Sequence, residues 1–489
     1  MSETPQGHEL FHQARERIQR GMVERGIPSL TIAVAQGNSV LWEEGFGWAD
    51  RERRIAATPH TLYSLASISK PITATALMIL KERGLLDLDH PINDYLGDSK
   101  LHAWVGNVDE ATVRRVANHT SGLPLHYQFF YQDEPYLPPP MGETIRRYGN
   151  LVTAPGERFQ YSNLGYGLLS EVITRLSGKS YADFLREEVF LPLGMLRASV
   201  NVGPGLEPYQ VQRYGSDGVR YPFYDCDHPG ASAVYCSAHD LTRFALFHLK
   251  QPLPDQKAIL SEETLDEMQA PTARQSALER YGIGWRIYDG TPDHSMFGHT
   301  GGMDGVNTLL RMHLSARIAI AILTNTNGNR DLEEQVVVDI LSVLLPTYAE
   351  KRARAREQRR QEQTDEPEAD FRPDAHLLGQ WHGHVHTYQG DIPLTLWFKE
   401  TGDVHARLGT QLKTLVNEAQ FKKQSFEGKM MGDISTSDAS RYPHHLYLDL
   451  KQREEMFTGA VIAVPIREKM PGKRFGMALS HWVELRKDP

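Results

Sequence analysis

Apolar residues near the start of the chain follow two different spacings. In residues 9–25 they recur every three to four positions, which predicts an amphipathic helix. Residues 29–35 and 39–46 instead read as two strands joined by a Gln-Gly-Asn hairpin turn. Residues 68–82 return to helical spacing, and Gly84 is placed to cap the end of that helix. The chain therefore opens with a helix, a hairpin and a second helix.

The pattern is mixed from about residue 90 to residue 275, and strand patterns then dominate. In the mixed part we expect helices over residues 166–176 and 240–249, separated by long loops rich in proline and tyrosine. Four apolar segments then predict strands, at residues 282–288, 296–301, 306–314 and 317–326. Helical patterns follow at residues 331–345 and 348–363, and we interpret the basic residues of the second as a solvated face.

Residues 364–374 form a polar segment with two prolines, which we interpret as a linker, and the pattern of apolar and polar residues changes after it. Residues 375–489 contain short strands at regular spacing, with turn signals and almost no helical periodicity. The strands are expected at residues 379–387, 393–399, 445–451, 458–464 and 476–485. This pattern predicts a small antiparallel barrel. We therefore expect one domain over residues 1–363 and a second over residues 375–489.

Composition and charge exclude several classes of protein. The 489 residues are 40% hydrophobic and 24% charged, which is ordinary for a protein with a sizeable core. The 53 Lys and Arg against 62 Asp and Glu give a net charge of −9, which disfavours nucleic acid as a partner. No apolar run approaches the roughly 18 residues of a membrane helix. The amino terminus lacks the basic start and apolar segment of a secretion signal, so we expect a cytoplasmic protein.

One Ser-x-x-Lys string, Ser67 to Lys70, lies where a strand pattern gives way to a helix. Residues three apart share a helix face, so Lys70 is expected beside Ser67. A lysine in that position can take the proton of the serine hydroxyl and make it a nucleophile. Free backbone N–H groups in a first helical turn stabilise a negative oxygen. The alternative interpretation is a serine that caps the helix beside an exposed lysine.

Three further strings carry groups that hydrolytic chemistry can use. Tyr161-Ser162-Asn163 offers a phenol to relay a proton and an amide to bind a substrate carbonyl. Tyr148-Gly149-Asn150 offers the same pair, and spacing alone does not choose between them. His299-Thr300-Gly301-Gly302 reads as a strand whose small residues let the backbone approach a ligand, with the Gly302 N–H as the second oxyanion donor. The alternative for each string is a packed loop or a glycine turn.

Taken in order, Ser67-x-x-Lys70, Tyr161-x-Asn163 and His299-Thr300-Gly301 resemble the three motifs of the penicillin-recognising serine hydrolases. That superfamily includes class C β-lactamases, D-alanyl-D-alanine carboxypeptidases, D-aminopeptidases and related esterases. The resemblance covers about residues 8–345. Four flanking strings are also similar to the family: Asn118-His119-Thr120-Ser121-Gly122-Leu123-Pro124, the Pro-Gly-Glu-x-Phe-x-Tyr-Ser-Asn run from Pro155, Leu191-Pro192-Leu193-Gly194-Met195, and Gly298-His299-Thr300-Gly301-Gly302.

The resemblance implies a fold and an architecture. The first domain is expected to be α/β and β-lactamase-like, with an antiparallel sheet flanked by helices and an all-helical insert. The C-terminal barrel resembles the lipocalin-like domain appended to some peptidases and esterases of the superfamily. For that barrel we consider three roles: covering the cleft, restricting substrate length, or mediating homo-oligomerisation.

The resemblance also implies a role for each motif residue, and it selects Tyr161 over Tyr148. Ser67 is expected to be the acylated nucleophile, Lys70 a base or proton partner, and Tyr161 the general base of acylation and deacylation. Asn163, His299, Thr300, Gly301 and Gly302 are expected to bind substrate, with the N–H groups of Ser67 and Gly302 forming the oxyanion hole. No cofactor or metal is expected.

One departure from the family shapes the expected function. Many members have lysine in the third motif where this chain has His299. A neutral imidazole attracts a substrate carboxylate less than lysine does, which disfavours β-lactamase or strict carboxypeptidase action. We expect a serine hydrolase that cleaves amide bonds of small peptides, including those with D-residues. The alternatives are a carboxylesterase or acyltransferase, a weak β-lactamase, and a non-catalytic binding protein.

Three other features have mainly structural interpretations. Aromatic residues crowd the segments 127–136 and 221–224, where they either line an apolar pocket or pack long loops. His382, His384 and His386 alternate along one expected strand, but no carboxylate or cysteine cluster accompanies them, so we do not expect a metal site. The two cysteines, Cys226 and Cys236, are expected to be free thiols, and His119 to be structural.

Overall fold

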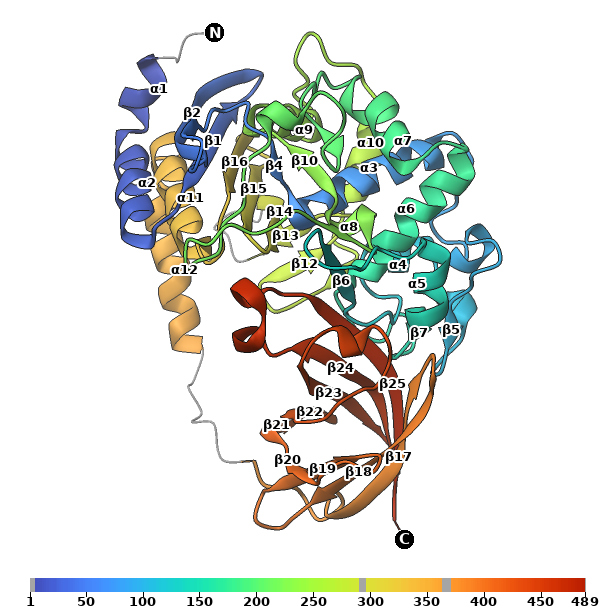
Figure 1. Cartoon of the computed structure of the whole chain (residues 1–489). Coiled ribbons are helices and arrows are strands. Elements are labelled where there is room, and N and C mark those ends of the chain that lie inside the picture. Colours follow the sequence, from blue (N-terminus) through green and yellow to red (C-terminus); the bar gives the residue numbers. More distant parts are fainter. Residues whose placement is uncertain (1–4, 290–295, 363–370, 489) are drawn as a thin grey trace. The chain divides into compact units, whose positions relative to one another are not determined.

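The computed structural model describes residues 5–289, 296–362 and 371–488. By their internal contacts these residues form two compact units (Figure 1). The first unit contains the described residues up to Leu88, Tyr131–Asp133, and those from Tyr166 to the end of helix α12 (Tyr348–Glu362). The second unit contains Asp89–Phe130, Glu134–Gly165 and the described residues that follow α12. Each unit is described separately below.

The first unit is built on one nine-stranded antiparallel sheet. Its strands, in spatial order, are β11 (Ala273–Arg274), β12 (Glu279–Tyr281), β13 (Arg286–Tyr288), β14 (Met296–Met303), β15 (Val306–His313), β16 (Ile318–Thr324), β1 (Ser29–Gln36), β2 (Ser39–Asp50) and β3 (Ile55–Ala56). Strand β1 pairs with both β2 and β16, so the amino-terminal hairpin completes a sheet whose other strands come from residues after 270.

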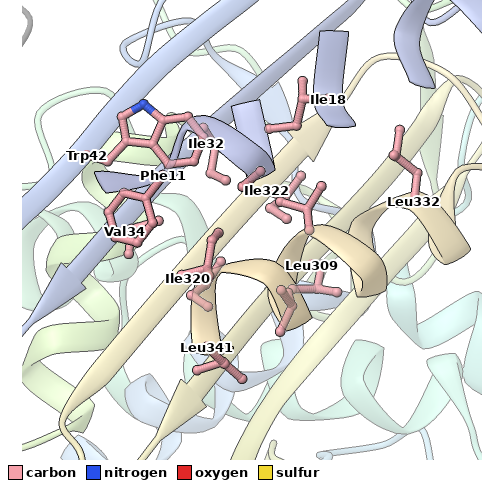
Figure 2. Packing of buried hydrophobic residues seen from close by; sticks show 14 of the residues in the cluster. Phe11, Ile18, Ile32, Val34, Trp42, Leu309, Ile320, Ile322, Leu332 and Leu341 are labelled. Atoms are coloured by element: carbon pink, nitrogen blue, oxygen red, sulfur yellow. The ribbon is translucent and has the colours of Figure 1, made fainter. Parts of the chain in front are cut away.

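Helices cover the central strands of this sheet on both faces, so the strands are buried throughout instead of alternating between buried and exposed positions. On one face, α2 (His12–Arg25) and α11 (Arg330–Leu344) pack on the sheet through a cluster of aliphatic and aromatic side chains (Figure 2). Phe11 stacks on Trp42 in this cluster, with ring centroids 5.5 Å apart. On the other face, α9 (Ala238–His248) contacts β1 and β16.

The helix that follows the motif serine lies in the same unit. It is α3 (Ser69–Glu82), and a short 3-10 turn, Ala66–Ile68, precedes it. The remaining helices of the first unit are α1 (Pro5–Leu10), α7 (Tyr181–Leu185), α8 (Pro229–Ser232), α10 (Glu262–Gln269) and α12. A small sheet has the strand order β4 (Tyr63–Ser64), β10 (Val234–Cys236), β8 (Ser199–Val200). Helix α6 (Asn163–Ser177) begins in the second unit and continues in the first.

The C-terminal residues form nine antiparallel strands that make a nearly closed barrel. In spatial order the strands are β20 (Thr414–Leu415), β19 (Val404–Leu408), β18 (Gly390–Phe398), β17 (Gly379–Thr387), β25 (Met477–Lys487), β24 (Met456–Pro465), β23 (His444–Arg453), β22 (Ser425–Met430) and β21 (Asn417–Lys422). Inward-facing aromatic rings fill part of the interior. The ring centroids of Trp381 and Phe457 are 4.6 Å apart, and those of Phe398 and Phe426 are 5.0 Å apart.

Residues 89–165, without Tyr131–Asp133, pack on this barrel within the second unit. They contain α4 (Val113–Ala117), α5 (Met141–Tyr148) and the short strands β5 (His102–Ala103) and β7 (Asn150–Leu151). Strand β6 (Tyr127–Tyr131) pairs with β25, and Trp104 stacks on Trp482 with ring centroids 5.8 Å apart. The segment thus holds short strands as well as helices, and it shares an apolar cluster with the barrel.

Most of the predicted elements are present. The sequence patterns located β1, α3, α11 and β17 within one residue of their ends, whereas the strand predicted at residues 39–46 stops four residues before the end of β2. They missed the strands β19 to β22. These strands are short or consist mainly of polar residues, and their residues alternate in exposure. The predicted domain boundaries rest on a change of composition and stay a prediction, and residues 364–370 of the expected linker lie outside the described residues. The contacts group residues 89–165 with the barrel, which composition did not indicate.

Candidate active site

Ser67 lies at the start of α3, within the 3-10 turn, and is the one accessible side chain in a buried stretch. Within residues 61–80 every side chain is buried except that of Ser67. The preceding residue, Ala66, has a φ of 48°, an uncommon conformation for a residue with a Cβ atom. Such strain persists only where the surrounding structure imposes it, and it is found preferentially at functional sites. The fold therefore exposes one hydroxyl at the end of a buried helix.

Lys70 is held against this hydroxyl. Its side chain has no solvent exposure, and its Nζ donates hydrogen bonds to Ser67 Oγ at 3.1 Å and to the carbonyl oxygen of Ala231 at 3.3 Å. The ring of Tyr166 lies 5.6 Å from the same nitrogen. The three-residue spacing on one helix face brings the amine to the serine, as the sequence predicts. A buried amine at this distance can exchange a proton with the hydroxyl.

Strand β14 carries the third motif and packs against the serine turn. A Cβ atom on Gly301 would meet the carbonyl oxygen of Leu65 at 2.2 Å and the Cβ of Ala66 at 3.0 Å, so only glycine fits there. At Gly302, by contrast, a Cβ would meet nothing within 4 Å, and the residue is exposed. Strand alternation puts Thr300 and Gly302 on the accessible face. The backbone of the motif is therefore the part open to a ligand.

His299 is on the opposite face of this strand and is fully buried. Its Nδ1 lies 2.7 Å from the carbonyl oxygen of Thr300, and its Nε2 lies 2.9 Å from the hydroxyl of Tyr281 on β12. In the neutral ring Nδ1 carries the proton and donates to the carbonyl, and Nε2 accepts from the tyrosine. The imidazole thus fixes the backbone of β14 from the buried face of the strand. The sequence alone could not distinguish this supporting role from direct substrate binding.

A polar group that sequence analysis missed holds the end of β14 in place. Arg330, the first residue of α11, donates to the carbonyl oxygen of Gly301 at 2.8 Å and to that of Thr308 at 2.7 Å. The guanidinium also pairs with Glu333 at 2.6 Å, and Asn307 donates to the same carboxylate at 2.7 Å. Burial raises the pKa of Glu333 to about 7, although Arg330 opposes this. The i, i+3 spacing of Arg330 and Glu333 was visible, but their contact with β14 was not.

The turn after β14 is fixed by buried aromatic residues. Tyr131 donates a short hydrogen bond to the carboxylate of Asp304, and Tyr224 donates to its carbonyl oxygen at 2.7 Å. The guanidinium of Arg213 lies 4.0 Å from the centre of the Tyr224 ring. Tyr131, Tyr221 and Tyr224 are all buried. Of the two interpretations of these aromatic segments, the structure shows packing for these three rings.

Tyr161 and Asn163 belong to the second unit, where they are partly exposed at the start of α6. The segment before them contacts His119, whose φ is 63°. His119 Nδ1 accepts a hydrogen bond from the N–H of Ser162 at 3.2 Å, and its ring centre lies 4.4 Å from that of Tyr161. Ser162 Oγ in turn accepts from the N–H of Gly165 at 3.2 Å, which caps the helix. His119 is structural, as predicted, and supports Tyr161 directly.

The competing tyrosine has a different setting. Tyr148 is buried, and its hydroxyl donates to Asp438 on the barrel side of the second unit at 2.7 Å. Its ring packs 4.5 Å from that of His126. A phenol held in this way is a structural group, which agrees with the choice of Tyr161 from the family resemblance.

The other candidate sites have ordinary partners. His382 pairs with Asp488 and His386 with Asp391, the latter at 2.9 Å. Across residues 5–289, 296–362 and 371–488 no group of three or more His, Cys, Asp or Glu is arranged to hold a metal ion. In the same ranges no helix is both long and apolar enough to cross a membrane. Cys226 and Cys236 are free and buried, and burial raises the pKa of both thiols.

Known proteins resemble this chain in sequence over about two thirds of its length. Penicillin-binding protein 4* of Bacillus subtilis (strain 168) is 26% identical over 336 residues, which are 63% of this chain and 70% of that protein. The putative penicillin-binding protein PbpX of the same organism is 26% identical over 321 residues, 65% of this chain and 75% of that protein.

Two solved structures share the fold over nearly the whole chain. The octameric penicillin-binding protein homologue from Pyrococcus abyssi has a TM-score of 0.60 at 22% identity, covering 92% of this chain and 97% of that one. SurE with D-Leu has a TM-score of 0.63 at 19% identity, covering 98% of this chain and 100% of that one. A class C beta lactamase from Rhodobacter sphaeroides has a TM-score of 0.57 at 22% identity, covering 68% of this chain and 99% of that one.

These identities are low, so the structural likenesses show the fold alone. The family assignment comes from the Beta-lactamase family profile, which matches residues 14–342 and thus spans every motif described above. The chain belongs to the Beta-lactamase family and has its serine-hydrolase fold.

Proposed function

We propose that this protein is a serine hydrolase that cleaves amide bonds of small peptides, including peptides with D-residues, through an acyl-enzyme. The observation that carries the proposal is the 3.1 Å hydrogen bond from the buried Lys70 amine to Ser67, the one accessible side chain of its stretch. The solved relative that is described with D-Leu supports the substrate class.

In the first half-reaction, Ser67 Oγ attacks the amide carbonyl while its proton passes to the Lys70 and Tyr161 pair. The negative charge that develops on the carbonyl oxygen is held by the N–H groups of Ser67 and Gly302. The exposure of Gly302 and the close approach of β14 to the serine turn support this oxyanion hole. Each lost donor would lower turnover on the order of 100- to 1000-fold. The amine then leaves with a proton, and water releases the acyl group from Ser67.

The role of Tyr161 is supported by the continuity of α6. Tyr166, whose ring lies 5.6 Å from Lys70 Nζ, follows Asn163 by three residues on that helix. Residues at this spacing share a helix face. We therefore propose that the start of α6 brings Asn163 to the substrate amide and Tyr161 to the serine hydroxyl. The reaction requires no cofactor.

A carboxylesterase or acyltransferase is the second candidate, and the buried His299 favours it over a β-lactamase. The third motif presents backbone and Thr300 to a ligand, and its histidine faces the interior. A motif without an outward cation gives little attraction to a substrate carboxylate, which neutral esters lack. A homo-oligomer is a further proposal, motivated by the octameric homologue from Pyrococcus abyssi.

The central experiment compares Ser67→Ala with Ser69→Ala. Ser69 is a buried neighbour whose hydroxyl accepts a hydrogen bond from the N–H of Val234 at 3.0 Å. We expect the first variant to lose turnover and covalent labelling by a fluorophosphonate, and the second to keep its labelling. The substrates are D- and L-aminoacyl amides, short peptides, p-nitrophenyl esters and nitrocefin.

The pattern of turnover then separates the candidates. Ester turnover without amide turnover would replace the peptidase proposal by an esterase, and nitrocefin turnover would indicate a β-lactamase. Activity that persists in Ser67→Ala would rule out the proposed nucleophile.

A further inference from the structure

The segment that carries Tyr161 has no regular structure of its own. Between β7 and α6, residues 152–162 form turns and bends with no helix or strand. One side of this segment is bonded to the chain around His119: Gln160 N–H donates to the carbonyl oxygen of His119 at 2.7 Å, and Gly156 N–H donates to that of Thr120 at 2.7 Å. Backbone bonds of this kind fix the path of the segment on one side only.

The barrel holds the other side of the segment with charged groups. Arg158 pairs with Asp449 of β23 at 2.7 Å, and Gln160 donates to the same carboxylate at 3.4 Å. Glu157 pairs with Lys451 of β23 at 2.6 Å and, through its other oxygen, with Arg453. Three consecutive outward positions of one barrel strand, each two residues apart, therefore hold three residues of the segment.

These pairs are partly withdrawn from water. The Glu157 side chain is 15% exposed and that of Asp449 is 24% exposed. Burial by itself raises the pKa of the Glu157 carboxyl, but the hydrogen bonds from Lys451 and Arg453 outweigh it and leave the pKa below its ordinary value. Ion pairs in such settings are screened less than fully exposed ones and hold a more defined geometry.

We propose that the C-terminal barrel holds the Tyr161 segment in its working geometry through Asp449, Lys451 and Arg453, which act as positioning residues for catalysis. Tyr161 lies three residues after Arg158 and one after Gln160, so a displacement of either passes directly to the phenol. The barrel is thus part of the hydrolase itself. This inference rests on the proposed role of Tyr161, because positioning matters to turnover only if that residue takes part.

The first test compares Asp449→Asn and Glu157→Gln with Asp391→Asn. Asp391 is a barrel carboxylate that pairs with His386 on the neighbouring strand. We expect both segment variants to lower kcat about tenfold with little change in KM, because small misplacements of a catalytic group act on the chemical step. The exchanged pair Arg158→Asp with Asp449→Arg should recover part of the loss. Loss of kcat in the Asp391 control equal to that in Asp449→Asn would overturn the proposal.

A second test separates positioning from general damage to the fold. In a Tyr161→Phe background, Asp449→Asn should lower kcat no further, because its effect passes through the phenol. If the full loss persists in that background, the barrel does not act through Tyr161 and the proposal fails.

A third measurement does not depend on activity. Hydrogen exchange of the backbone amides of residues 153–163 should rise in Asp449→Asn and Glu157→Gln and stay unchanged in Asp391→Asn. Unchanged exchange in the segment variants would refute the proposed positioning. If exchange rises while the wild type shows no turnover that depends on Ser67, the barrel contact stands and the proposed hydrolase function is what fails.

Discussion

The two compact units fix the motif residues that each contains by different physical means. In the first unit, Lys70 and His299 are completely buried, and the serine turn and β14 are held by regular secondary structure and close backbone packing. In the second unit, Tyr161 follows an irregular segment that is held by a histidine ring and by ion pairs to the barrel. Close packing depends little on salt concentration, whereas partly exposed ion pairs are weakened by salt. The segment that precedes Tyr161 should therefore be more sensitive to salt than the serine turn and β14 are.

The largest expected effect comes from a comparison of a Tyr161 variant with a Tyr148 variant. Tyr161→Phe should lower kcat by on the order of 100-fold or more, since positioned proton transfer contributes about that much. Tyr148→Phe should retain turnover but lose about 1–2 kcal/mol of stability with its hydrogen bond to Asp438. Steady-state kinetics and thermal unfolding of both variants distinguish the two roles. Equal kcat in both variants would remove Tyr161 from the mechanism.

The stability of the first unit should respond to a single methyl group added where β14 packs against the serine turn. Gly301→Ala would place a Cβ 2.2 Å from the carbonyl oxygen of Leu65, so the strand must move away from the serine turn. We expect a loss of about 1–3 kcal/mol in the free energy of unfolding. Gly302→Ala, where a Cβ meets nothing within 4 Å, should leave the unfolding temperature near that of the wild type. A similar unfolding temperature for both variants would contradict the close packing of β14.

The stability of the first unit should also depend on pH. Because burial raises the pKa of Glu333 to about 7, the folded state keeps this proton in a range where the unfolded state, with a pKa near 4.5, has lost it. The free energy of unfolding should therefore fall as the pH rises from about 4.5 to 7 and then level off. Glu333→Gln should flatten this slope in denaturant unfolding, and Glu334→Gln should leave it in place. A slope unchanged in Glu333→Gln would exclude this carboxyl as its source.

The sequence predicted α3 and the strands of the first unit well because the patterns that indicate them are local. Helical spacing located α3 and put Lys70 beside Ser67, and apolar runs located β14 to β16. The face on which His299 lies could not be predicted, because both faces of the central strands are apolar and alternation then gives no direction. The strained turn at Ala66 packs against Gly301, more than 200 residues later in the chain. Arg330 reaches Gly301 from a different element, 29 residues away.

The setting of Tyr161 in the second unit was less predictable for a related reason. Its motif was recognised by resemblance to a family, since a loop tyrosine beside an asparagine also occurs at Tyr148. The residues that hold it, Asp449 and Arg453, lie on a polar strand face almost 300 residues later, where charged side chains are ordinary. No local pattern marks a surface charge as half of a pair.

The stacking of Trp104 on Trp482, together with the packing of Val152 against the same indole, has a practical consequence for anyone who shortens the chain. A fragment that stops after α12 would retain all three family motifs yet expose Val152 and increase the exposure of Trp104, which is 41% exposed in the full chain. Such a product would tend to self-associate, and its inactivity would say nothing about chemistry. Dissection of this protein is better begun by point substitution than by truncation.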